Sequence, residues 1–124
     1  MINFRIACLV TMIVCLAVFA ILLVAPLSYV GGYGASADAG ADFMGRRAAP
    51  IFLGLALVTG LLRGSIDLTV QWAVSWAVIV AFLGTALTGI YAYAQGDAAQ
   101  PILIAAFGEV LIAGIFALSL RRPG

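Results

Sequence analysis

The stretch IACLVTMIVCLAVFAILLVAPLSYV, residues 6–30, decides the fold class, because none of its side chains is charged. A transmembrane helix needs about 20 mainly apolar residues to cross a hydrocarbon core roughly 30 Å thick. The run is also longer than the hydrophobic region of a secretory signal peptide, so we expect a retained membrane span. This span is predicted from about Ile6 to Tyr29, with Pro26 in its last turn.

The rest of the chain has the same apolar character. Of 124 residues, 65% are hydrophobic and 9% are charged, whereas soluble domains average about 25% charged residues. A backbone inside lipid must satisfy its own hydrogen bonds, which favours helices. The sequence therefore predicts an all-α integral membrane four-helix up-down bundle, with residues 1–124 as one transmembrane domain. Its predicted segments are spans 6–29, 48–62, 68–93 and 101–120, and a flexible Gly-rich loop, 31–45.

The second span is the shortest of the four. Only residues 48–62 separate Arg47 from Arg63, and the sixteen helical steps between the two arginines cover about 24 Å, less than the hydrocarbon core. Pro50 suits the first turn of such a helix. Alternatively, the helix begins near Asp42 as N-cap and kinks at Pro50. In both cases an arginine must extend toward the membrane surface, or the bilayer must thin.

Short polar segments mark the other helix ends. Ser65 or Asp67 can cap the third span, and Pro101 opens the fourth. The last two spans are expected to be antiparallel neighbours that pack through small residues. These residues are Ala77, Ala81, Gly84, Thr85, Thr88 and Ala92 on one helix, and Ala105, Ala106, Ala113 and Ala117 on the other.

The distribution of arginine predicts the orientation. All six basic residues are Arg, which together with abundant Ala and Gly indicates a GC-rich bacterial genome. One side of a four-span bundle carries Arg5, Arg63, Arg121 and Arg122, and the other carries Arg46 and Arg47. Positive charge favours the cytoplasmic side. We therefore expect a protein of the bacterial inner membrane with both termini in the cytoplasm.

Glu109 is the one acidic residue well inside a predicted span. A charged side chain there costs about 2.5–3.5 kcal/mol on insertion scales. The carboxyl group can stay protonated, or it can find a partner. Thr85 and Thr88 lie at a similar depth, so a hydrogen bond from one of these hydroxyls is the simplest solution. Arg46 and Arg47 are the cations on that side, although spans two and four are diagonal in a plain up-down bundle.

Several function classes are disfavoured by composition. The chain has no His, and a net charge of +1 gives no reason to expect nucleic acid as a partner. We expect no enzymatic activity, no cofactor and no metal site, and we interpret Cys8 and Cys15 as small apolar packing residues.

Two functional hypotheses remain open at this point. The first is a structural or accessory protein of the lipid bilayer, which assembles with itself or with a larger membrane complex. The second is a small transporter or ligand-binding bundle. Its candidate polar site would comprise Glu109, Thr85, Thr88, Arg46 and Arg47.

The segment MGRRAAPIFLGLAL, residues 44–57, is the most distinctive motif. Together with Arg63 and Glu109, it resembles small four-helix bacterial membrane proteins that are known only as uncharacterised. This resemblance implies a four-span layout and no particular activity. Small multidrug transporters have a similar size and span count, but their acid lies in the first span, where this chain has none.

Overall fold

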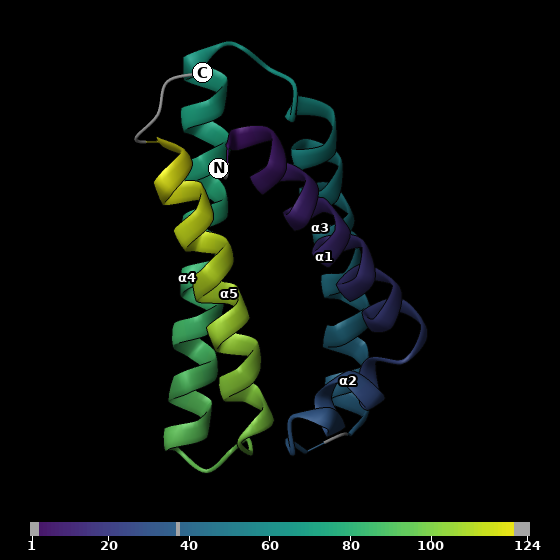
Figure 1. Ribbon diagram of the computed structural model, residues 1–124. Coiled ribbons are helices and arrows are strands. Elements are labelled where there is room, and N and C mark those ends of the chain that lie inside the picture. Colours follow the sequence, from purple (N-terminus) through teal and green to yellow (C-terminus); the bar gives the residue numbers. More distant parts are fainter. Residues whose placement is uncertain (1–2, 37, 121–124) are drawn as a thin grey trace.

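The computed structural model describes residues 3–36 and 38–120, and over these residues the chain forms five helices (Figure 1). They are α1 (Phe4–Val24), α2 (Pro26–Gly32), α3 (Ala39–Leu62), α4 (Leu68–Ala94) and α5 (Pro101–Leu120). All except the short α2 are long and apolar enough to cross a membrane. The predicted all-α, four-span up-down bundle is therefore confirmed.

The four long helices are arranged as two antiparallel pairs. Helix α1 packs along α3, and α4 packs along α5, whereas the contacts between the pairs are much smaller. In Figure 1 the two pairs meet near the N-terminus of the chain and separate below it. At the meeting end, the rings of Phe4 and Phe116 pack edge-to-face with their centroids 6.2 Å apart.

The first span is shorter than expected. Helix α1 ends at Val24, Ala25 leaves the helical conformation with φ −142° and ψ 61°, and Pro26 opens the separate helix α2. The prediction of one helix through Tyr29 is therefore corrected. Proline has no N–H to donate and disfavours a helical conformation in the residue before it, which explains the break at Ala25.

The second span is longer than expected, and it replaces much of the predicted loop 31–45. Helix α3 begins at Ala39, where Asp38 Oδ1 accepts a hydrogen bond of 2.9 Å from the N–H of Ala41. Pro50 lies inside the helix, as the alternative interpretation expected, but the N-cap is Asp38 and not Asp42. With 24 residues the helix extends about 36 Å, enough to cross the hydrocarbon core.

The third and fourth spans begin at the expected signals. Asp67 caps α4, with its Oδ1 accepting a hydrogen bond of 2.8 Å from the N–H of Thr69. Helix α5 runs from Pro101 to Leu120, the range expected from the sequence.

The packing face of α4 differs from the prediction. Gly84, Thr85 and Thr88 are exposed, and a Cβ on Gly84 would meet nothing within 4 Å. The buried hydrophobic residues of α4 are Val74, Val78, Ile79, Phe82 and Ala86. The expectation that the small face of α4 meets α5 is therefore wrong at its centre. Branched and aromatic side chains offer more van der Waals contact than the small ones, and they occupy the interior instead.

Candidate functional site

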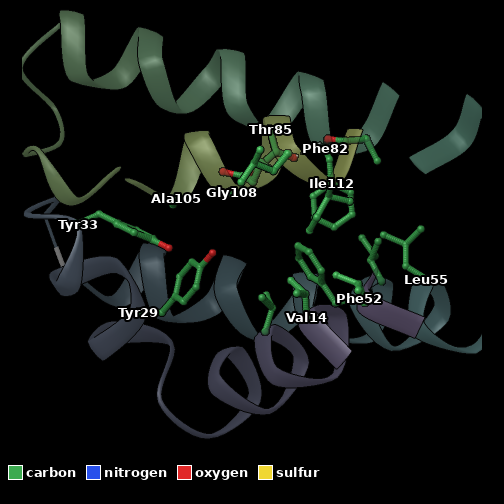
Figure 2. Close-up of a pocket in the computed structure, with 16 residues that line it drawn as sticks. Val14, Tyr29, Tyr33, Phe52, Leu55, Phe82, Thr85, Ala105, Gly108 and Ile112 are labelled. Carbon is green, nitrogen blue, oxygen red and sulfur yellow. Dashed lines mark hydrogen bonds between the residues drawn. The ribbon is translucent and has the colours of Figure 1, made fainter. Parts of the chain in front are cut away.

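A cavity of about 610 Å³ lies between the two helix pairs (Figure 2). Each of the four long helices contributes to its wall, and Tyr29 and Tyr33 extend the wall at the α2 end. Most of the lining is aliphatic or aromatic, including Val14, Phe52 and Ile112. The site is thus built from segments distant in the sequence, and its interior is largely apolar.

Contacts between the helix pairs bound the cavity at both ends. One end is the core that contains Phe4 and Phe116. At the other end, the N–H of Ala99 donates a hydrogen bond of 2.7 Å to the carbonyl oxygen of Tyr33. Gly34 permits this contact, because its φ is +71° and a Cβ there would lie 2.6 Å from Cβ of Ala99. The α2 end of one pair is thereby joined to the loop of the other.

Part of the cavity lining consists of exposed side chains on membrane-spanning helices. Ile51 and Leu111, which line the cavity, are 66% and 53% exposed, and both belong to membrane-spanning helices. Exposed apolar side chains at these positions contact lipid rather than water. The cavity lining therefore reaches the lipid-facing surface of the bundle.

The polar groups of the lining are few. They are the side chains of Glu109, Thr85, Tyr29 and Tyr33. Glu109 is half-buried. Throughout residues 3–36 and 38–120, no side chain or backbone group makes a hydrogen bond or ion pair with its carboxyl group. A carboxyl group thus lines an apolar cavity without a partner from the described part of the chain.

The two tyrosines lie on the same side of this cavity. Their rings pack edge-to-face with centroids 5.1 Å apart. Figure 2 shows both hydroxyl groups directed into the cavity rather than away from it. Neither Tyr29 nor Tyr33 belongs to the candidate polar site that the sequence predicts. Their spacing of four residues on one helical face indicates a pair, but only once Pro26 is taken as the start of a helix.

The two threonines do not form the hydrogen bond that was expected with Glu109. Thr85 lines the cavity, but its hydroxyl donates to the carbonyl of Ala81 at 2.7 Å. The hydroxyl of Thr88 donates to the carbonyl of Thr85 at 2.9 Å, and Thr88 is not part of the lining. Threonine in a helix can always reach a carbonyl one turn earlier, and here that local bond is the one formed.

The two arginines lie away from Glu109. Arg46 forms an ion pair of 3.1 Å with Asp42, and the guanidinium of Arg47 lies 5.6 Å from the ring centroid of Phe43. Both side chains are exposed, and neither lines the cavity. Because α3 begins earlier than expected, these arginines have partners within their own helix. Of the predicted polar site, the structure brings together Glu109 and Thr85 and leaves the other three residues outside.

The lining offers limited chemistry. It contains one carboxyl group, two phenols and a hydroxyl already engaged with its own helix. Among the described residues, no group of three or more His, Cys, Asp or Glu side chains is placed to hold a metal ion. Cys8 and Cys15 are buried and stand outside the lining. The groups present are suited to holding a positive charge or a hydrogen-bond donor.

Comparison with known proteins identifies no relative. No family model, curated protein or solved structure matches the chain. The four apolar helices are consistent with a small four-span membrane protein, and the resemblance of residues 44–57 to a particular group stays a prediction.

Proposed function

We propose that this four-span protein is a ligand-binding bundle that holds a largely apolar molecule with a single cationic head group. The observation that carries the proposal is the carboxyl group of Glu109, which lines an apolar cavity and has no hydrogen-bond or ion-pair partner among residues 3–36 and 38–120. The protein acts by binding and, in this proposal, not by catalysing a reaction.

The size and lining of the cavity support a small organic ligand. Small-molecule sites have volumes of roughly 300–1,000 Å³ and combine apolar walls with a few polar groups. The cavity, at about 610 Å³, falls in this range. Because exposed residues of membrane-spanning helices belong to its lining, a molecule that already partitions into the bilayer is favoured.

The charge of the ligand follows from Glu109. An ionised carboxylate in the membrane is costly unless an opposite charge lies close to it. A cationic head group supplies that charge, and the nearby rings of Tyr29 and Tyr33 add favourable cation–π contacts. An anionic head group would be repelled by the same carboxylate.

The test compares two probe ions of matched shape and opposite charge, tetraphenylphosphonium and tetraphenylborate, with the protein in lipid nanodiscs. We expect the cation to bind more tightly, and Glu109→Gln to weaken it by about tenfold, or 1.4 kcal/mol. Asp97→Asn, which removes an acid outside the cavity, is the matched control. Equal binding of both ions, or an unchanged affinity in Glu109→Gln, would contradict the proposal.

Transport is the stronger form of the same proposal. It requires that the bound molecule be released on both sides of the membrane. Uptake of tetraphenylphosphonium into sealed proteoliposomes, compared between the unmodified protein and Glu109→Gln, distinguishes carriage across the bilayer from binding alone.

A structural or accessory role is the second candidate function. It is favoured by the exposed face of α4, where Gly84 and Thr88 lie in a membrane-spanning helix without a neighbour against Gly84. Small residues on such a face allow another transmembrane helix to approach closely. Native mass spectrometry in mild detergent tests this role. A homo-oligomer, or a co-purified membrane protein, is expected, and Gly84→Leu should disrupt it.

We also propose a location in the bacterial inner membrane with both termini in the cytoplasm. Arg5 and Arg63 lie at one end of the bundle, and Arg46 and Arg47 lie toward the other. When Arg121 and Arg122 are counted with the first two, the distribution is four arginines against two, which agrees with the positive-inside rule. Arg121 and Arg122 lie outside the described part of the chain. A reporter fused after Gly124 tests the proposal, since fluorescent proteins and phosphatases are active on opposite sides of that membrane.

A further inference from the structure

A second pocket, of about 240 Å³, lies at the opposite end of the bundle from α2. It is formed where the N-terminus of α1 meets the turn between α3 and α4. Its polar lining residues are Asn3, Arg5, Arg63, Ser65 and Gln71. Two arginines therefore share one pocket, although they are far apart in the sequence.

The charge of this pocket is unbalanced. Within the described part of the chain, no Asp or Glu lines it. Neither Arg5 nor Arg63 forms an ion pair with a carboxylate of residues 3–36 or 38–120. Asp67, which is close in sequence, uses its carboxylate to cap α4. Two guanidinium groups around one pocket repel each other unless an anion lies between them.

The structure holds one of the arginines and the turn beside it in place. An Nη1 of Arg63 donates to the carbonyl of Gly60, which leaves the other N–H groups of the guanidinium available. The amide of Gln71, only 9% exposed, donates to the carbonyl of Ser65 at 2.8 Å. The wall of the pocket is thus supported by a buried polar contact and does not depend on an anion to form.

The position in the membrane indicates the source of the anion. The pocket lies at the ends of three membrane-spanning helices, where α1 begins, α3 ends and α4 begins. Helix ends of this kind lie near the lipid head groups. Ile66, on the rim of the pocket, is 93% exposed, and Trp72 in the first turns of α4 is 57% exposed. Exposed apolar and Trp side chains at this level contact lipid.

We propose that this pocket binds the phosphate group of an anionic phospholipid. Arginine is suited to phosphate, because its planar fork can donate two parallel hydrogen bonds. Arg5 and Arg63 contact the phosphate from α1 and from the end of α3, while the exposed side chain of Ile66 contacts the glycerol and acyl regions. A bound lipid therefore bridges the start of α1 and the end of α3, beside the turn that leads to α4.

The experiment measures lipid retention by native mass spectrometry, with the protein released from nanodiscs of equal parts phosphatidylglycerol and phosphatidylcholine. We expect the unmodified protein to retain phosphatidylglycerol preferentially. Arg5→Gln combined with Arg63→Gln should reduce this preference about tenfold. The matched control is Arg46→Gln with Arg47→Gln, which removes the same charge at the other end and should leave the preference unchanged.

Because Arg63 donates a hydrogen bond to Gly60, its replacement could also disturb folding. The single variant Arg5→Gln distinguishes a loss of lipid binding from such a folding defect. Arg5 makes no side-chain hydrogen bond to residues 3–36 or 38–120, and its loss should weaken lipid retention while helical circular dichroism is unchanged. An unchanged preference in Arg5→Gln and in the double variant overturns the proposal, as does an equal loss in the control. Added inorganic phosphate distinguishes a phospholipid from free phosphate as the occupant of the pocket. If millimolar phosphate does not displace the lipid, a phospholipid site is supported. If it displaces the lipid fully, the phospholipid is overturned as the occupant.

Discussion

The space between the helix pairs differs sharply at its two ends. At the end near the N-terminus, Phe4 and Phe116 fill it, and both are almost fully buried. Toward α2, the same helix α5 presents Ala105, Gly108 and Glu109, and a cavity remains. The two helix pairs are thus in contact where aromatic rings face each other, and they leave a cavity where small side chains do.

The comparison teaches how a cavity persists in a membrane bundle. Small residues normally let helices approach each other in lipid. Here approach is limited at both ends, by the aromatic contact on one side and by the bond between Tyr33 and Ala99 on the other. Between these two contacts, Gly108 and the small residues near it leave a gap, and the polar groups of the lining border that gap.

The largest expected effect tests the closed end. Phe116→Ala should lower the free energy of unfolding by about 3 kcal/mol, because a fully buried ring is replaced by a cavity. Reversible unfolding in mixed micelles measures the difference. Phe107→Ala is the control, since Phe107 is 66% exposed and should change stability far less. Similar losses in both variants would mean that the aromatic contact does not hold the pairs together.

The second largest effect tests whether loose packing is confined to the space between the two helix pairs. Within the first pair the packing is tight, because a Cβ on Gly45 would lie 2.6 Å from Cβ of Pro26. Gly45→Ala should therefore cost about 1–3 kcal/mol of stability. In the same helix, Gly54→Ala meets nothing within 4 Å and should be neutral or slightly stabilising. A neutral Gly45→Ala would show that α2 also moves freely.

A third change sharpens the comparison by filling the open end. Gly108→Leu adds a side chain where a Cβ would meet nothing within 4 Å, in the wall of the cavity. We expect binding of tetraphenylphosphonium to weaken about tenfold while stability is maintained. Isothermal titration and unfolding measured on the same sample separate the two quantities. Unchanged binding would place the ligand elsewhere.

The smallest expected effect concerns Arg46, which the sequence places in the same candidate polar site as Glu109. Arg46→Gln breaks only an exposed ion pair with Asp42, so stability should fall by no more than about 0.5 kcal/mol. Binding of the probe cation should stay the same, since Arg46 is outside the cavity lining. A clear rise or fall in cation affinity would show that Arg46 reaches the site after all.

The fold was largely predictable from the sequence, and the site was predictable in part. The apolar run of α1 and the start at Pro101 depend on local chemistry and were identified directly, and Asp67 was one of the two residues expected to cap α4. Glu109 was recognised because an acid in an apolar run is unusual. Its neighbours were not, because the predicted partners Thr85 and Thr88 found acceptors within their own helix, as side chains often do when a local bond is available.

By itself, the sequence determined that the chain forms apolar helices able to cross a membrane, since hydropathy and backbone hydrogen bonding are properties of each segment alone. Only the tertiary structure decided that Pro26 starts a new helix against Gly45, that Tyr29 and Tyr33 join Glu109 in one cavity, and that Arg5 shares a pocket with Arg63. These outcomes depend on how the shapes of distant helices fit together, and no local pattern encodes that fit.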